Sequence, residues 1–222
     1  MKTPSDNQPL TIALTKGRIL KDTLPLLAKC GLDPVEDPEK SRRLVLESKR
    51  PGVRFVLLRG ADVVTYVRQG AADAGVVGKD MLLEYGASGL YEPLDLGLAR
   101  CSLQTAGFEA GRKEGNRLRV ASKFVNVARS FYAAKGVQAD IIKLYGAMEL
   151  APMLGLVDEI VDIVDTGNTL RANGLVPFEH IADISTRFVV NKAAMRTRHA
   201  LLTDIMGALE AASRSSWRCE IS

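Results

Sequence analysis

The chain has 222 residues, of which 46% are hydrophobic and 25% are charged. This composition is typical of a globular protein and excludes disordered and collagen-like chains. Its 30 basic and 26 acidic residues leave a formal net charge of +4, which is too mild and too scattered to indicate a nucleic-acid-binding surface, although it is compatible with a pocket for a polyanionic small molecule.

Short apolar runs rich in β-branched residues alternate along the chain with longer amphipathic stretches, which predicts an α/β fold. We expect strands at residues 10–14, 54–58, 74–77, 118–121, 141–143, 160–164 and 181–190. We expect helices at residues 19–30, 63–69, 79–85, 125–135, 147–154 and 169–173, and a last surface helix from 194 to about 213. Glycines should end four of the helices, namely Gly31, Gly70, Gly136 and Gly174.

The chain is expected to form two lobes. The glycine-rich, charged segment 108–117 (FEAGRKEGNR) lies where a chain could leave one lobe, and the β-rich run over 184–190 could carry it back. We therefore expect lobe I at residues 1–105 with 186–222, lobe II at residues 106–185, and a cleft between them. A single unbroken sheet is the alternative.

No targeting or membrane signal accompanies these elements. The three cysteines, Cys30, Cys101 and Cys219, have no CxxC spacing and indicate neither a disulfide framework nor a zinc site. The first nine residues lack the order of a signal peptide, and no apolar run approaches the ~20 residues that span a bilayer. We expect a cytoplasmic protein without membrane or nucleic-acid partners.

The strongest motif covers residues 161–171, where an apolar strand with an acidic end runs into a Thr-Gly-x-Thr turn that opens a helix. Unpaired backbone N–H groups, the helix end and the hydroxyls of Thr166 and Thr169 would form a phosphate cradle, and Gly167 lets the backbone come close. Asp162 and Asp165 would repel the anion but suit sugar hydroxyls or hydrated magnesium. The motif predicts a site for a phosphorylated sugar. The alternative is that Asp165 or Thr166 merely caps the helix.

Three further strand-to-helix turns combine glycine with charge. Lysine at a helix start is unfavourable beside the helix dipole, so their joint occurrence favours ligand binding, although each alone could be an ordinary turn. In addition, guanidinium groups match phosphate oxygens in geometry, so arginines are candidates for phosphate binding. Arg59 is one of them, because it directly follows an apolar strand. The candidate ligand-binding residues at these turns and among the arginines are Lys16, Gly17, Arg18, Gly78, Lys79, Tyr145, Glu149, Arg42 and Arg59.

Five stretches of the chain, in this order and spacing, resemble the short-form catalytic subunit of the ATP phosphoribosyltransferase family, over about residues 10 to 205. They are residues 14–20 (LTKGRIL), 62–67 (DVVTYV), 70–80 (GAADAGVVGKD), 143–152 (KLYGAMELAP) and 162–175 (DIVDTGNTLRANGL). The resemblance implies a two-lobed, periplasmic-binding-protein-like (type II) α/β fold. It also implies a Mg2+-dependent reaction, the first step of histidine biosynthesis, in which N1 of ATP displaces pyrophosphate from phosphoribosyl pyrophosphate.

The resemblance assigns roles to the candidate residues. It implies that phosphoribosyl pyrophosphate is bound by Asp73, Glu149, Asp162, Asp165, Thr166, Gly167, Asn168 and Thr169. It implies that ATP is bound by Lys16, Gly17, Arg18, Gly78, Lys79 and Tyr145, and that Arg59, Arg42 and Lys16 act in catalysis on phosphate groups. No dedicated protein site for the metal is expected, because pyrophosphate and water would hold most of the Mg2+.

Partners follow from the same resemblance. Short-form members form a catalytic homodimer and rely on a regulatory subunit similar to histidyl-tRNA synthetase. Val64 and Thr15 depart from the more usual proline and serine without removing a candidate ligand. Two other readings are a type I phosphoribosyltransferase, which usually has adjacent carboxylates at the strand end, and a non-enzymatic solute-binding module of the same fold.

Overall fold

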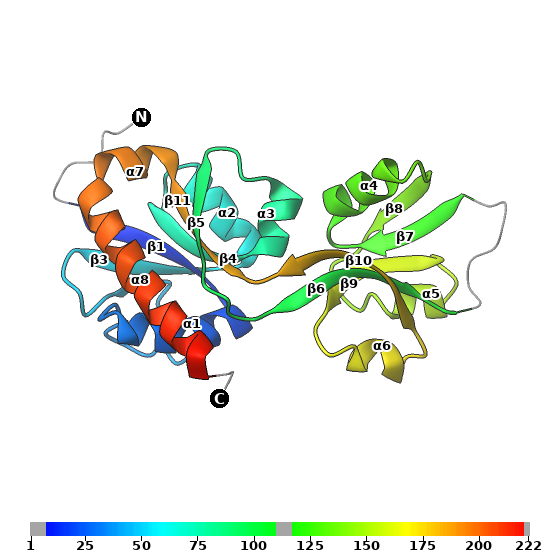
Figure 1. Cartoon of the computed structure of the whole chain (residues 1–222), viewed down its shortest axis with the longest axis horizontal. Helices are drawn as coiled ribbons and strands as arrows, with labels where there is room; N and C mark the ends of the chain where they lie inside the picture. Colours follow the sequence, from blue (N-terminus) through cyan, green and yellow to red (C-terminus); the bar gives the residue numbers. More distant parts are fainter. Residues whose placement is uncertain (1–7, 110–116, 220–222) are drawn as a thin grey trace. The chain divides into compact units, whose positions relative to one another are not determined.

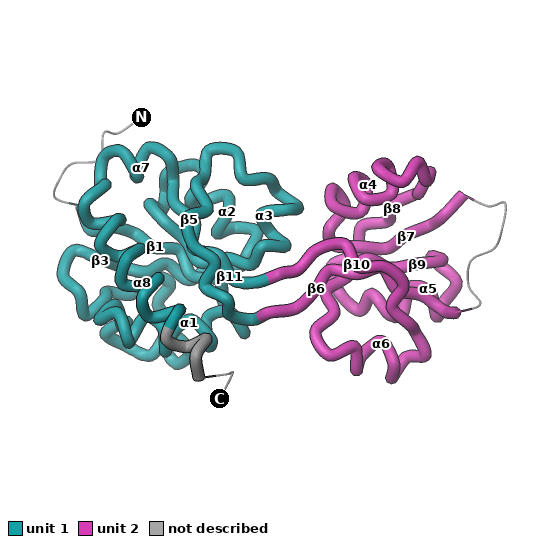
Figure 2. The backbone as a smooth tube through the Cα atoms, viewed as in Figure 1, with its two compact units in different colours: residues 1–99, 185–222 teal, residues 100–184 magenta. Residues whose placement is uncertain are grey.

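The computed structural model of the chain describes residues 8–109 and 117–219, which form two compact units. Unit 1 comprises residues 1–99 and 185–222, and unit 2 comprises residues 100–184 (Figure 2). The chain passes into unit 2 at Ala99–Arg100, earlier than the expected boundary, and returns at Ile184–Ser185. Most of the glycine-rich segment 108–117 lies outside the described residues, and its described ends belong to unit 2.

Unit 1 contains a six-stranded sheet in the order β2-β3-β1-β4-β11-β5, of which Figure 1 labels β1, β3, β4, β5 and β11. Strands β1, β3 and β4 are parallel, so their carboxyl ends share one edge, whereas β2, β11 and β5 each run antiparallel to a neighbour. The strands are β1 (Leu10–Thr15), β2 (Val45–Glu47), β3 (Val53–Leu58), β4 (Ala74–Gly78), β5 (Leu90–Asp95) and β11 (Thr186–Asn191). The helices are α1 (Arg18–Lys29), α2 (Gly60–Arg68), α3 (Lys79–Tyr85), α7 (Lys192–Thr197) and α8 (His199–Cys219).

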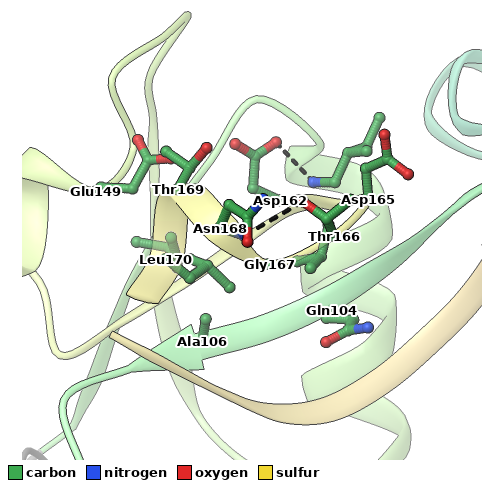
Figure 3. Close-up of a pocket in the computed structure, with 13 residues that line it drawn as sticks. Gln104, Ala106, Glu149, Asp162, Asp165, Thr166, Gly167, Asn168, Thr169 and Leu170 are labelled. Atoms are coloured by element: carbon green, nitrogen blue, oxygen red, sulfur yellow. Dashed lines mark hydrogen bonds between the residues drawn. The ribbon is translucent and has the colours of Figure 1, made fainter. Parts of the chain in front are cut away.

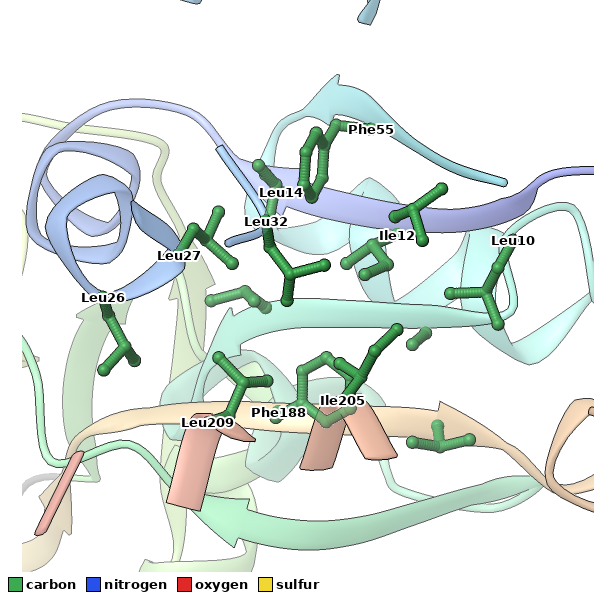
Figure 4. Close-up of a cluster of buried hydrophobic side chains, with 14 of the residues drawn as sticks. Leu10, Ile12, Leu14, Leu26, Leu27, Leu32, Phe55, Phe188, Ile205 and Leu209 are labelled. Carbon is green, nitrogen blue, oxygen red and sulfur yellow. The ribbon is translucent and has the colours of Figure 1, made fainter. Parts of the chain in front are cut away.

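Both faces of this sheet are buried, which explains why its central strands are continuously apolar. Side chains on one face, such as those of Ile12 and Phe188, pack with Leu26 and Leu27 of α1 and with Ile205 and Leu209 of α8 (Figure 4). The alternate residues Ala13, Val77 and Val189 face the opposite way and pack with Val63, Val64 and Val67 of α2 and Leu82 of α3. Helices therefore cover the two faces and leave the strand ends for other contacts.

Unit 2 contains a five-stranded mixed sheet in the order β10-β6-β9-β7-β8. Strand β9 is parallel to β7 and antiparallel to β6. An apolar cluster that includes Ile160, Met148 and Leu170 packs α5 and α6 against the sheet. The strands are β6 (Cys101–Gly107), β7 (Leu118–Ser122), β8 (Ala139–Lys143), β9 (Glu159–Val164) and β10 (Val176–Ile184), and the helices are α4 (Val125–Ala134), α5 (Leu150–Met153) and α6 (Asn168–Ala172).

The α/β fold and most of the predicted elements are confirmed, with ends that differ by a few residues. The four glycines expected to end helices all have a positive φ, between 66° and 74°, as this role requires. Strands β2, β5 and β6 were not predicted. No helix in the described part of the chain is both long and apolar enough to cross a membrane.

Three predicted elements need correction. The run 181–190 is two strands, because β10 pairs with β6 in unit 2 whereas β11 pairs with β4 and β5 in unit 1. The last helix is divided at Arg198, whose guanidinium donates to the carbonyl of Gln8 and lies 3.6 Å from Asp73. The helix predicted over 147–154 is only α5, because Ala147 has a φ of 49° and cannot be helical.

Candidate functional site

A pocket of about 150 Å3 opens in unit 2 at the carboxyl end of β9. Apolar side chains of Ala106, Ile160 and Leu170 form part of its lining, and polar groups from three segments complete it (Figure 3). The polar lining consists of Gln104, Glu149, Asp162, Asp165, Thr166, Gly167, Asn168 and Thr169. The structure therefore gathers in one place the Thr-Gly-x-Thr turn and three of the acidic residues that the sequence singled out.

The turn at residues 165–169 lines the pocket and contains backbone donors without acceptors in the described chain. Gly167 has a φ of 72°, a left-handed conformation that glycine adopts without strain. The N–H groups of Gly167 and Thr169 donate to no acceptor within residues 8–109 and 117–219, and both residues line the pocket. Helix α6 has only 5 residues, so these N–H groups, more than a helix dipole, are the features that favour an anion.

The acidic side of the pocket is electrostatically unusual. Burial raises the pKa of Asp162, and the nearby Glu149 carboxylate raises it further, while Lys123 and the backbone N–H of Ile163 lower it. The Ile163 N–H donates to Asp162 Oδ1 at 2.8 Å. A half-buried carboxylate of this kind is suited to accepting hydrogen bonds from hydroxyl groups or to facing developing positive charge.

Two residues of the site were missed in the sequence. Gln104 on β6 pairs directly with Asp162 on β9 in the antiparallel ladder, so their side chains share one face of the sheet. Its amide Nε2 donates to Ser102 Oγ at 2.6 Å. Lys123 follows β7 and places its ammonium 3.7 Å from Asp162 Oδ1. The sequence carries no local signal for either residue, because Gln104 reaches the pocket, and Lys123 reaches Asp162, through pairing between distant strands.

The predicted basic residues lie in unit 1 at the carboxyl edge of its parallel strands. Lys16 follows β1, and its backbone N–H donates to the carbonyl of Leu58, the last residue of β3. Arg59 comes next in the chain, so Lys16 and Arg59 are neighbours at this edge. Arg42 precedes β2, which runs antiparallel to β3 and so begins at this same edge. The side chains of Lys16, Arg42 and Arg59 are exposed and form no ion pair with any described residue.

The glycines and remaining cations at this edge have local contacts. Gly17 has a φ of 90° and a ψ of −142°, which only glycine adopts readily. Arg18 lies 3.8 Å from Asp22 on the next turn of α1. A side chain at residue 78 would displace Asp80, because a Cβ added at Gly78 would lie 2.2 Å from Asp80 Oδ1. Lys79 is bound by both oxygens of Glu92, at 2.9 and 2.6 Å.

Two predicted ligands belong neither to the carboxyl strand ends of unit 1 nor to the lining of the pocket in unit 2. Asp73 precedes β4, at the amino end of the strand, where it accepts the N–H of Thr11 at 2.8 Å and lies 3.6 Å from Arg198. These contacts are those of a residue that holds unit 1 together. Tyr145 belongs to unit 2 and is 86% exposed. Its ring lies 5.3 Å from the ammonium of Lys143, and it does not line the pocket.

The carboxylates of the pocket suit a magnesium ion that is shared with a ligand. Among the described residues, no group of three or more His, Cys, Asp or Glu side chains could hold a metal ion by itself. Glu149, Asp162 and Asp165 nevertheless offer hard oxygen donors in one pocket. Mg2+ usually takes one or two carboxylates and completes its shell with water and substrate phosphates, so this donor set fits the ion.

Comparisons with known proteins agree with one another. The family model "HisG: ATP phosphoribosyltransferase" matches residues 59–211. An ATP phosphoribosyltransferase from Pseudomonas putida is 59% identical over 209 residues, which cover 94% of this chain and 99% of the relative. One from Ectopseudomonas mendocina is 60% identical over 206 residues, covering 91% and 98%. The solved ATP phosphoribosyl transferase (HisG:HisZ) complex from Thermotoga maritima is similar in structure, with a TM-score of 0.82, 33% identity, and coverage of 93% of this chain and 98% of that one.

Proposed function

The chain belongs to the ATP phosphoribosyltransferase family, and on that premise we propose which of its residues bind the two substrates. The enzyme transfers the 5-phosphoribosyl group from phosphoribosyl pyrophosphate to N1 of ATP and releases pyrophosphate, as the first step of histidine biosynthesis. We propose that the pocket of unit 2 holds the sugar phosphate. The basic residues at the carboxyl edge of the parallel strands of unit 1 hold the charged phosphates of pyrophosphate and ATP.

One observation carries the first half of this proposal, namely the unpaired N–H groups of Gly167 and Thr169 at the pocket in unit 2. The 5-phosphate accepts hydrogen bonds from these groups and from the Thr166 and Thr169 hydroxyls. Glu149, Asp162 and Asp165 would be repelled by the phosphate, so they take the ribose hydroxyls. Gln104 extends this polar wall and offers an amide that can both donate and accept.

The second half of the proposal concerns Lys16, Arg18, Arg42 and Arg59, with Gly17 and Gly78 allowing close approach of the backbone. Support comes from their shared edge in unit 1 and from the exposed, unpaired cations of Lys16, Arg42 and Arg59 within the described chain. Lys79 contributes less in our view, because Glu92 already neutralises it. Asp73 and Tyr145 are not part of this assignment.

The chemistry needs alignment and charge stabilisation more than a nucleophilic side chain. A bond forms between N1 of adenine and the anomeric carbon while the bond from that carbon to the pyrophosphate oxygen breaks, and the bonding pair leaves with pyrophosphate. Positive charge develops on the sugar, which the carboxylates of the pocket stabilise, and negative charge develops on the leaving group, which the basic residues stabilise. Holding both substrates in line supplies a large part of the acceleration.

We propose Mg2+ as the metal of the reaction, held by Glu149, Asp162 or Asp165 together with substrate phosphates. When bound, the ion would neutralise charge on the pyrophosphate group. The support is the chemistry of the donor set, which is all oxygen and too small to enclose an ion without ligand phosphates.

We also propose that the chain is a short-form catalytic subunit that forms a homodimer and works in the cytoplasm with a regulatory subunit similar to histidyl-tRNA synthetase. The support is that the chain spans 98–99% of the relatives named above and resembles a subunit solved as a HisG:HisZ complex. Cys30 and Cys101 form no disulfide with any described residue, which is compatible with a reducing compartment.

The sugar-phosphate assignment is tested with Thr169→Val, which removes the hydroxyl and keeps the shape of the side chain. Pyrophosphate release is measured with and without the regulatory subunit, while each substrate is varied in turn. We expect the KM for phosphoribosyl pyrophosphate to rise about tenfold, with little change in the KM for ATP. Thr197→Val on α7 is the control, because among the described residues its hydroxyl bonds only to its own helix. Unchanged kinetics of Thr169→Val contradict the assignment.

A further inference from the structure

Arg171, in the last turn of α6, folds back over the turn that precedes the helix. Its Nη2 donates to the carbonyl of Thr166 at 2.9 Å and to Asn168 Oδ1 at 2.5 Å. Thr166, Gly167 and Asn168 line the pocket, whereas Arg171 does not. The guanidinium therefore holds the turn without being part of the pocket wall.

We propose that Arg171 is a positioning residue that makes this turn selective for an anion, an inference that rests on the proposed function of the pocket. A guanidinium group only donates hydrogen bonds, so Asn168 must turn its oxygen toward Arg171. The amide NH2 group is then the part of the Asn168 side chain left to meet a ligand. Arg171 thus makes Asn168 a donor, as a phosphate requires.

The same contact controls the Thr166 carbonyl. A carbonyl oxygen that faced the pocket would repel a phosphate and would need another partner when buried beneath it. In this structure the Thr166 oxygen is occupied by Arg171, and the neighbouring N–H groups of Gly167 and Thr169 stay without acceptors in the described chain. Arg171 therefore occupies the Thr166 carbonyl and leaves the N–H donors of the turn available to a ligand.

Gly167 fits this arrangement for a steric reason as well as for its positive φ. A Cβ added at Gly167 would lie 3.1 Å from Arg171 Nη1, which is tighter than ordinary contact. The absence of a side chain at residue 167 allows the guanidinium to lie close over the turn. Glycine and arginine thus act as a pair in shaping the segment.

The test compares Arg171→Met and Arg171→Lys in the full chain by steady-state kinetics, with thermal melting to verify folding. We expect Arg171→Met to raise the KM for phosphoribosyl pyrophosphate about tenfold while the KM for ATP and kcat stay within about twofold. Arg171→Lys keeps the charge on a shorter side chain, and we expect it to leave that KM raised. A return to the original KM in Arg171→Lys overturns the proposal, since charge alone would then suffice.

Arg119→Met is the matched control. Arg119 lies in the same unit and also bonds a backbone carbonyl, that of Gly155, together with Asp158, but it does not line the pocket. We expect its KM values to match the unmodified chain. If Arg119→Met raises the KM for phosphoribosyl pyrophosphate as much as Arg171→Met does, the effect is general to unit 2 and the proposal fails.

Coupling and salt dependence separate positioning from direct binding. If Arg171 acts by holding Asn168 and Thr166, the losses caused by Arg171→Met and Asn168→Ala combine to less than their sum, and the effect of Arg171→Met is the same at low and high salt. Additive losses that shrink with salt indicate a direct charge contact and overturn the proposal. If Thr169→Val raises the KM for phosphoribosyl pyrophosphate and Arg171→Met does not, only this inference fails. If neither variant does, the proposed function of the pocket fails as well.

Discussion

The ammonium group of Lys123 lies 3.7 Å from a carboxylate oxygen of Asp162, the acid whose pKa is raised by burial in the pocket of unit 2. Lys123 opposes that rise, so Lys123→Met should raise the pKa of Asp162 further. A carboxyl group with a raised pKa in the folded state binds more protons there than in the unfolded state. The protein therefore loses stability as the pH rises above the ordinary pKa of aspartate, because ionising Asp162 costs more in the folded state than in the unfolded state.

We accordingly expect Lys123→Met to lower the free energy of unfolding by about 1 kcal/mol near neutral pH and by less below the ordinary pKa of aspartate. Urea unfolding at the two pH values measures this difference. Lys143→Met is the control, because that ammonium lies over the Tyr145 ring. An equal loss at both pH values would show that Lys123 acts through packing on Phe124 and not through charge.

Gly167→Ala tests whether strain in this turn affects substrate binding as well as stability. The left-handed φ of 72° should cost about 1–2 kcal/mol of stability once a Cβ is present. Gly31→Ala has the same kind of strain, with a φ of 66°, but its Cβ would meet no atom within 4 Å. We expect similar losses in unfolding free energy from the two variants and a raised KM for phosphoribosyl pyrophosphate only in Gly167→Ala. Equal substrate affinity in both would argue against the turn as the phosphate site.

Asp73→Asn tests whether Asp73 serves structure or substrate. The side chains of Asp73 and Arg198 are 18% and 15% exposed, and the carboxylate also accepts the Thr11 N–H, so we expect a loss of about 2 kcal/mol. Asp204→Asn removes a 63%-exposed partner of Arg50 and should cost less than about 0.5 kcal/mol. Chemical unfolding measures both. A raised KM for phosphoribosyl pyrophosphate with unchanged stability would restore the ligand role that the resemblance implied.

Arg59→Ala should lower activity and leave stability nearly unchanged, the reverse of what we expect for Asp73→Asn. Its side chain is exposed and has no ion-pair partner in the described chain, so the melting temperature should hardly change. Turnover should fall at least about tenfold if the guanidinium stabilises charge on pyrophosphate. Arg214→Ala, which breaks an exposed pair with Glu210 on α8, is the control for removal of a surface arginine. Full activity of Arg59→Ala would exclude its catalytic role.

The sequence predicted those parts of the fold whose signals are local. Strands such as β1 and β4 are buried on both faces and read as apolar runs. Strand β5 (LYEPLD) was missed because it is an edge strand, where proline and acidic residues are tolerated. Strand β6 (CSLQTAG) was missed because its residues are mostly small or polar, so periodicity carried little information.

The same distinction holds for the pocket of unit 2. Residues 165–169 are contiguous, so their turn chemistry could be read directly from the sequence. Gln104 and Lys123 reach Asp162 only because β9 lies between β6 and β7 in the sheet, and a single sequence does not reveal that order. Asp73 resembled a ligand by its motif, but its partner Arg198 is distant in the chain, and a single sequence does not reveal that contact.

The position of β11 has a consequence for how the polypeptide is made. This strand lies between β4 and β5 in the sheet of unit 1, although unit 2 is synthesised before it. A nascent chain leaving the ribosome therefore completes all residues of unit 2 while the first sheet still lacks an inner strand. A translation product that stops before residue 186 would leave facing edges of β4 and β5 open to aggregation.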